Sequence, residues 1–126
     1  MTWFGAESAC NNISGHLVKV DTEEEQLLLV AEIKRRSNWR REFTYMWIGL
    51  NDLEEEGSWR WLDSSNATVS FWGSNQPNSA ALQYSRGTGD QDCAVMDMSS
   101  YDGRWNDFWC GKSDYSSKSF HGICEI

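Results

Sequence analysis

The sequence predicts a single domain of the α+β class, because helical patterns come first in the chain and strand patterns follow them. The length of 126 residues suits one hydrophobic core. Apolar residues at helical spacing occur within the first 37 residues, whereas aromatic-rich strand segments alternate with Ser-, Asn- and Gly-rich stretches after residue 44. The even number of cysteines, four, favours a disulfide-stabilised fold.

The first predicted element is a short helix over residues 3–10. Trp3, Ala6 and Cys10 recur at helical spacing, and Gly15 supplies a stop. A strand over residues 17–20 is expected to follow.

A second helix is predicted from a capping pattern and a run of apolar residues. Thr22 and Glu25 form the T-x-x-E capping box, and acidic residues crowd the first turn. The residues at helical spacing are Leu27, Val30, Ala31 and Lys34. The basic cluster over residues 34–41 is interpreted as the helix C-terminus, where positive charge is favoured, and not as a binding patch.

The remaining elements are strands separated by one long loop. Strands are expected over residues 45–50, 58–62, 93–98, 104–106 and 122–126. Residues 63–89 contain Pro77, the single proline of the chain, and show no convincing helix or strand pattern. A stretch of this length is too long for a passive connection in a compact domain, so the loop is predicted to be functional.

The charge balance and the motifs exclude several classes of function. The chain has 19 acidic and 11 basic residues, a net charge of −8, which argues against a general binder of nucleic acids or of anionic membranes. The longest aliphatic run, residues 27–31, is far shorter than the roughly 20 residues that span a bilayer. The sequence contains neither H-E-x-x-H nor G-x-S-x-G, so an enzyme is not expected.

The cysteines point to an oxidising compartment, and hence to a secreted or extracellular protein. They are not arranged as C-x-x-C, so disulfides are favoured over a zinc site, and three pairings remain open. Two glycosylation sequons, at Asn12 and Asn66, agree with export.

Oxygen-bearing side chains cluster in and around the long loop. They lie in residues 51–57, in Gln76-Pro77-Asn78, and in residues 90–92 together with Trp105-Asn106-Asp107. Calcium prefers six to eight oxygen ligands from carboxylates, carbonyls and water, so these groups together predict a Ca²⁺ site.

Seven motifs of the chain form a recognisable set. They are Trp3-x-x-Ala6-x-x-x-Cys10, Gly15-His16-Leu17-Val18, Trp47-Ile48-Gly49-Leu50, Trp59-x-Trp61, Gln76-Pro77-Asn78, Trp105-Asn106-Asp107 and Gly122-Ile123-Cys124-Glu125. With Cys93 and Cys110, they make the sequence resemble a C-type lectin-like domain over essentially its whole length.

The resemblance implies a double-loop fold of two helices and two small antiparallel sheets, formed by residues 1–126 as one domain. It implies disulfides between Cys10 and Cys124 and between Cys93 and Cys110, and a calcium and ligand loop over about residues 63–92. Members of this family usually begin with a strand ahead of the first helix. Little precedes Trp3 in this sequence, so an exposed sheet edge could pair with a second copy as a homodimer.

The resemblance also implies a calcium ion that binds sugar hydroxyls directly. Its protein ligands would be Gln76, Asn78, Gln91, Asn106 and Asp107. Gln76, Asn78, Asn106 and Asp107 would also hydrogen-bond to the sugar. Only Asp107 in this set is anionic, so a weaker affinity for calcium is expected. Gln76-Pro77-Asn78 is a hybrid of the mannose-type and galactose-type tripeptides, so it does not decide between these sugars.

An auxiliary calcium site is implied at Asp52, Glu56 and Asp92, with Asp90 near enough in sequence to replace a missing acid. These three positions keep their negative charge. We therefore expect calcium to occupy this site at least as readily as the sugar site.

The predicted function is a calcium-dependent carbohydrate-binding module that performs no covalent chemistry. Tyr84 and Trp72, in or beside the long loop, are candidates for stacking on a sugar ring, whereas the other tryptophans of the motifs are expected in the core. The alternative is an interaction domain of the same fold that binds a protein or ice, with calcium structural or absent.

Overall fold

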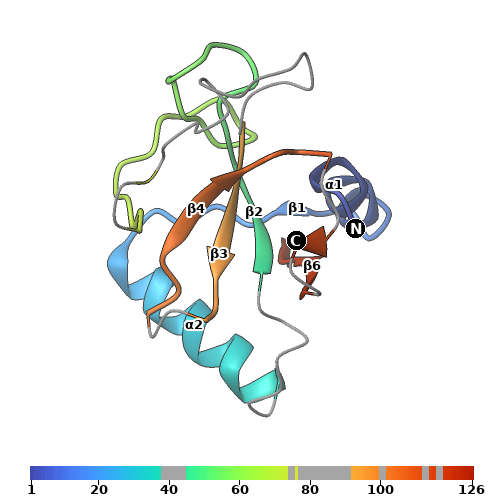
Figure 1. Ribbon diagram of the computed structural model, residues 1–126, viewed down its shortest axis with the longest axis vertical. Helices are drawn as coiled ribbons and strands as arrows, with labels where there is room; N and C mark the ends of the chain where they lie inside the picture. Colours follow the sequence, from blue (N-terminus) through green and yellow to red (C-terminus); the bar gives the residue numbers. More distant parts are fainter. Residues whose placement is uncertain (38–44, 74–75, 77–91, 100–101, 112–113, 116–117) are drawn as a thin grey trace.

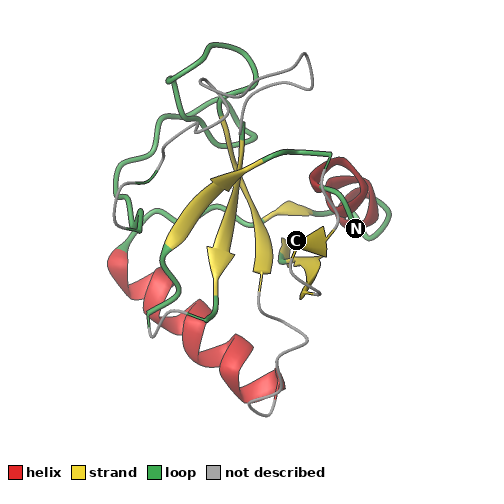
Figure 2. Cartoon of the chain, in the orientation of Figure 1, coloured by secondary structure: helices red, strands yellow, loops and turns green. Residues whose placement is uncertain are grey.

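A computed structural model describes the fold for most of the chain. The residues described are 1–37, 45–73, 76, 92–99, 102–111, 114–115 and 118–126. Within them the chain forms two helices and two sheets. Figures 1 and 2 show how these elements are arranged. This is the predicted α+β class.

The helices are α1 (Trp3–Asn11) and α2 (Glu23–Ser37). The strands are β1 (His16–Leu17), β2 (Tyr45–Asn51), β3 (Cys93–Asp97), β4 (Trp105–Phe108), β5 (Asp114–Tyr115), β6 (Lys118–Gly122) and β7 (Cys124–Glu125). β1 and β7 form an antiparallel pair, and the larger sheet has the order β4-β3-β2-β6-β5. The pairs in the larger sheet are antiparallel except that of β2 with β6, which is parallel.

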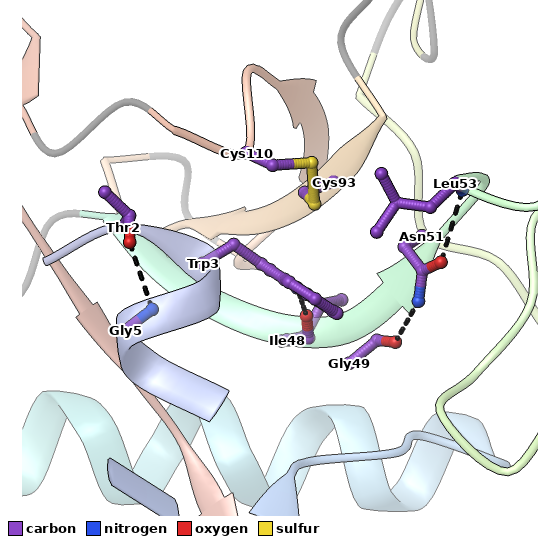
Figure 3. Close-up of a disulfide and its surroundings, with 9 residues drawn as sticks. All are labelled: Thr2, Trp3, Gly5, Ile48, Gly49, Asn51, Leu53, Cys93 and Cys110. Atoms are coloured by element: carbon purple, nitrogen blue, oxygen red, sulfur yellow. Dashed lines mark hydrogen bonds between the residues drawn. A yellow bond between two sulfur atoms is a disulfide. The ribbon is translucent and has the colours of Figure 1, made fainter. Parts of the chain in front are cut away.

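Helix α1 confirms the first predicted helix and extends it by one residue. Thr2 caps the helix, its hydroxyl accepting a hydrogen bond from the Gly5 N–H at 3.0 Å (Figure 3). Trp3 is buried, and its indole N–H donates to the backbone oxygen of Ile48 at 2.9 Å. This bond attaches the start of α1 to the central strand of the larger sheet.

Helix α2 confirms the capping box but not the predicted apolar face. The Glu25 N–H donates to the Thr22 hydroxyl at 3.1 Å. The buried positions are Gln26, Val30 and Ile33, whereas Leu27 and Ala31 are exposed, so the predicted stripe is wrong at both of those positions. The consecutive leucines place apolar side chains on several faces of this helix. Packing against the sheet determines which face is buried.

Three predicted strands are corrected. The strand expected over residues 17–20 ends at Leu17, although Val18 still donates its N–H to the Ile123 oxygen at 2.8 Å. Residues 58–62 form no strand; only Arg60 makes isolated bridges, to Asn51 and Asn66. Positive φ angles at Gly57 (84°) and Ser64 (72°) turn the chain on either side of Arg60 and prevent a longer ladder. Strands β5 and β6 were not predicted, and the single strand expected over residues 122–126 is wrong, because Gly122 ends β6 and only Cys124 and Glu125 form β7.

The core has two halves, one on each face of the larger sheet. Along β2, Tyr45 and Trp47 belong to the half that contains α1, whereas Met46 and Ile48 belong to the half that contains α2. Both faces of β2 are therefore covered, which explains its uninterrupted apolar sequence. In the part of the chain described, no helix is long and apolar enough to cross a membrane.

The two disulfides implied by the family resemblance are confirmed. Cys10 is bonded to Cys124 with a Cα–Cα distance of 5.4 Å, and Cys93 is bonded to Cys110 with a Cα–Cα distance of 5.2 Å (Figure 3). The first bridge joins α1 to β7. The second holds the start of β3 beside the segment that follows β4.

Candidate functional site

A cluster of carboxylates lies where β2 ends and β3 begins. The two strands are antiparallel, with Asn51 of β2 opposite Cys93 of β3. The residue after β2, Asp52, therefore lies beside the residue before β3, Asp92. The Asp52 N–H donates to the backbone oxygen of Asp92 at 2.9 Å, which fixes the two chain segments together.

The side chains of this cluster lie together, at the three positions that the family resemblance implies for the auxiliary site. Asp52, Glu56 and Asp92 each offer a carboxylate oxygen, and these atoms lie within 4.8 Å of one another. Asp52 is only 2% exposed, and its Oδ2 accepts the Gly57 N–H at 2.8 Å. Within the residues described, Oδ1 of Asp52 and Oδ1 of Asp92 are buried and have no hydrogen-bond donor. Two buried acceptors without donors fit a site built for a cation.

The electrostatics of Asp52 support the same interpretation. Burial, followed by the neighbouring carboxyl groups of Glu56 and Asp92, raises the pKa of Asp52 to about 8. The hydrogen bond from Gly57 opposes this shift but does not cancel it. Three carboxylates at this distance repel one another. A divalent cation bound at the two oxygens without donors would replace this repulsion with attraction.

The second group of predicted ligands lies on β4 and on the chain beside it. Asp107 is opposite Ala94 of β3, and it is buried. Asn106 is partly buried, and its side-chain amide donates to Oδ2 of Asp97 at 3.4 Å.

Gln76 reaches this group although it is far away in the sequence. The backbone around Gly73 runs alongside Trp105, with the Gly73 N–H donating to the Trp105 oxygen at 2.9 Å. The Gln76 N–H donates to the Gly73 oxygen at 3.0 Å, which holds Gln76 near β4. The Gln76 side-chain oxygen consequently accepts the Asp107 N–H at 3.3 Å.

Four other predicted site residues lie outside the described residues, and Trp72 lies beside the core. Asn78, Tyr84, Asp90 and Gln91 are outside the residues described. Trp72 is partly buried, and its ring packs edge-on against Trp59 and Trp105, with centroid distances of 4.9 and 5.9 Å. These contacts hold the ring against the core, and its role in stacking on a sugar ring stays a prediction.

Gln26 is a positioning residue that sequence reasoning missed. It lies on α2 and is 2% exposed. Its side-chain oxygen accepts the Trp105 indole N–H at 3.1 Å, and its side-chain nitrogen donates to the Gly103 oxygen at 2.9 Å. Gln26 thus fixes the start of β4, directly before Asn106. A polar residue four positions before Val30, on the buried helix face, was the signal that could have identified it.

Gln26→Met should test this role, because methionine keeps the length of the side chain but removes both hydrogen bonds. The Trp105 N–H and the Gly103 oxygen would remain buried without partners, so we expect a loss of about 1–3 kcal/mol in the free energy of unfolding. Urea denaturation measures the loss. Glu23→Met, at an exposed position of the same helix, is the control, and an equal loss in both variants would contradict the proposed role.

Comparisons with known proteins agree on one family. A sequence model described as "Lectin C-type domain" matches residues 1–125. C-type lectin domain family 4 member M from Symphalangus syndactylus is 33% identical over 116 residues, which are 90% of this chain and 23% of that protein. The chain thus spans about a quarter of the length of this curated relative.

Solved structures with a similar fold include a carbohydrate-recognition domain and an antifreeze protein. The cow carbohydrate-recognition domain of CD23, determined in the presence of a GlcNAc2Man3 oligosaccharide, matches with a TM-score of 0.72 and 32% identity, over 98% of this chain and 78% of that one. A calcium-independent type II antifreeze protein matches with a TM-score of 0.67 and 27% identity, over 89% of this chain and 72% of that one.

Proposed function

The chain belongs to the C-type lectin family, and on that basis we propose that it is a calcium-dependent carbohydrate-binding module. The observation that carries the proposal is the acidic cluster of Asp52, Glu56 and Asp92, with two buried carboxylate oxygens that have no donor in the described residues. The repulsion among these carboxylates is relieved when a cation binds to them or when one of them keeps its proton.

In this proposal the auxiliary calcium binds to Asp52, Glu56 and Asp92. Calcium is a hard cation that takes six to eight oxygen ligands, so water or backbone oxygens would complete its coordination. When bound, the ion neutralises the carboxylates and holds the end of β2 against the start of β3. The loop that leads to the sugar site is thereby fixed at its base.

The sugar-site calcium would bind to Asn106, Asp107 and Gln76, together with Asn78 and Gln91, which lie outside the described residues. The amides contribute neutral dipoles, so this ion would bind more weakly than the auxiliary one. The side chains supply both acceptors and N–H donors, which suits vicinal sugar hydroxyls, because each hydroxyl can donate and accept. Tyr84 is the proposed ring-stacking residue, and the class of sugar is mannose-like or galactose-like.

Calorimetry and a glycan array test this proposal together. Asp107→Asn should reduce glycan binding at least tenfold, about 1.4 kcal/mol, while a tight calcium-binding event remains. The chelator EDTA should abolish glycan binding by the unmodified protein. Glu55→Gln is the control, because it removes one exposed charge from the neighbouring loop. Glycan capture that persists after calcium is removed would contradict the proposal.

The second candidate is an interaction domain that binds a protein or ice without a sugar-site calcium. The Gln76 side-chain oxygen already accepts the Asp107 N–H, and the calcium-independent antifreeze protein shares the fold, which favour this alternative. An array without glycan signal in calcium, together with a retained protein partner, would favour it over sugar binding.

We also propose an extracellular location. Both disulfides require an oxidising compartment to form and persist. Asn12 and Asn66, the acceptors of the two sequons, are exposed and could carry glycans.

A further inference from the structure

Helix α2 carries large apolar side chains on the face that points away from the sheet. Leu27 is 55% exposed and Leu28 is 63% exposed, although the opposite face of the helix is buried. Figure 2 shows α2 at the periphery of the molecule, with the larger sheet on one side of it. The two adjacent leucines form a small apolar patch on the outer face of this helix.

Four of the exposed residues of α2 form a stripe with internal symmetry. Glu24, Leu28, Ala31 and Arg35 are all exposed, and their spacing of four, three and four residues places them along one side of the helix. The stripe is symmetric about the midpoint between Leu28 and Ala31. If a second α2 lies antiparallel across this midpoint, Glu24 meets Arg35 of the second copy, and Leu28 meets Ala31 of the second copy.

We propose that the outer face of α2 binds the same face of a second copy of this chain, in an antiparallel pair with twofold symmetry. At the centre, the large Leu28 faces the small Ala31, which lets the helices approach closely. At each end, the acidic first turn of one helix faces the basic last turn of the other. Antiparallel helix dipoles favour the same arrangement.

The charges at the ends extend ion pairs that exist within each helix. Arg35 already binds Glu32 of its own helix at 2.6 Å, and its side chain is 70% exposed. Glu24 of the second copy would add to this ion pair and form a three-membered network across the interface. A self-complementary surface of this kind generates closed dimers and not open chains, because the contact is the same in both directions.

The expected dimer is weak. A single pair of helices gives an interface at the low end of the size range, so we expect a dissociation constant between about 1 μM and 1 mM. The dimer does not depend on sugar or calcium. Only its consequence rests on the proposed function: two sugar sites in one particle would increase avidity for a multivalent glycan.

Sedimentation equilibrium at protein concentrations up to about 1 mM tests the proposal without any ligand. We expect dimers for the unmodified chain and at least a tenfold weaker association for Leu28→Glu. Ile13→Glu introduces the same charge at another exposed apolar residue, outside α2, and it should leave association unchanged. A monomer over the whole range, or equal effects of the two variants, would overturn the proposal.

Charge exchange tests the antiparallel geometry. Glu24→Arg and Arg35→Glu should each weaken self-association, since like charges would then meet at both ends. An equimolar mixture of the two variants should associate again, because each mixed pair restores both opposite-charge contacts. Circular dichroism checks that each variant is folded, and Ala31→Glu serves as a second disrupting variant. Failure of the mixture to recover, when the single variants do weaken association, would contradict the antiparallel pairing.

Discussion

Replacing both Cys10 and Cys124 with alanine is expected to lower the free energy of unfolding by about 4–5 kcal/mol. The bridge joins residues 114 apart in the sequence and therefore closes a loop over nearly the whole chain. On the chain-entropy account, a loop of about 100 residues contributes about 4.7 kcal/mol by restricting the unfolded state. Since single domains are stable by about 5–15 kcal/mol in total, this variant should be close to unfolding at 37 °C.

Replacing Cys93 and Cys110 with alanine should have a smaller effect on stability and a larger one on calcium binding. This bridge joins residues only 17 apart, for which the same account gives about 3 kcal/mol. Cys93 directly follows Asp92, however, so the bridge also supports the acidic cluster.

Urea denaturation and calcium titration at low temperature separate the two effects. The Cys10 and Cys124 variant should lose stability but keep its calcium affinity, whereas the Cys93 and Cys110 variant should lose both. A larger stability loss from the short bridge would mean that local packing around it outweighs chain entropy.

Local signals made the helices predictable. The capping box at Thr22 and Glu25 acts over three residues, so the start of α2 can be read directly from the sequence. The face that α2 buries depends instead on the sheet it meets. Gln26 is buried because Trp105 and Gly103 supply its partners from about 80 residues away, and no local pattern contains that information.

The candidate site, like α2, combines features that local sequence predicts with features that depend on contacts between distant segments. Oxygen-bearing residue types could be found by reading the sequence, but their assignment to two separate sites came from the family resemblance. Asp52 meets Asp92 because β2 and β3 pair in one particular register, and Gln76 meets Asp107 because Gly73 is hydrogen-bonded both to Trp105 and to Gln76. Register and loop path depend on contacts between distant segments, so spacing alone could not give them.

Asp52→Asn is expected to change stability in opposite directions with and without calcium. In the metal-free protein the substitution should raise the free energy of unfolding by about 1–3 kcal/mol at pH 8, because it removes one of three crowded carboxylates and its amide can donate to the unpaired Oδ1 of Asp92. Calcium should stabilise the unmodified protein but not this variant, since the buried ligand has lost its charge.

The pH dependence gives the same experiment a second readout. The pKa of Asp52 is about 8 in the folded protein, well above its ordinary value of 3.8, which an unfolded chain would show. Between these two pH values the Asp52 carboxyl group keeps its proton in the folded state but loses it in the unfolded state. The metal-free protein should therefore lose stability as the pH rises from about 4 to 8. Asp52→Asn should remove this loss. Because calcium must displace that proton, its stabilising effect on the unmodified protein should increase over the same pH range.

Chemical denaturation with EDTA and with calcium, at several pH values, measures both effects, and Glu55→Gln is the matched control. That variant removes one negative charge from an exposed side chain of the same loop, so it should reproduce any general effect of net charge and nothing more. The opposite signs of the two stability changes distinguish a calcium ligand from a residue that only supports the fold. Substitution of such a residue would destabilise both the metal-free and the calcium-bound protein. If Asp52→Asn leaves the effect of calcium intact, the ion does not bind to this cluster. If it weakens the metal-free protein, crowding of the three carboxylates is not the cause of their instability without metal.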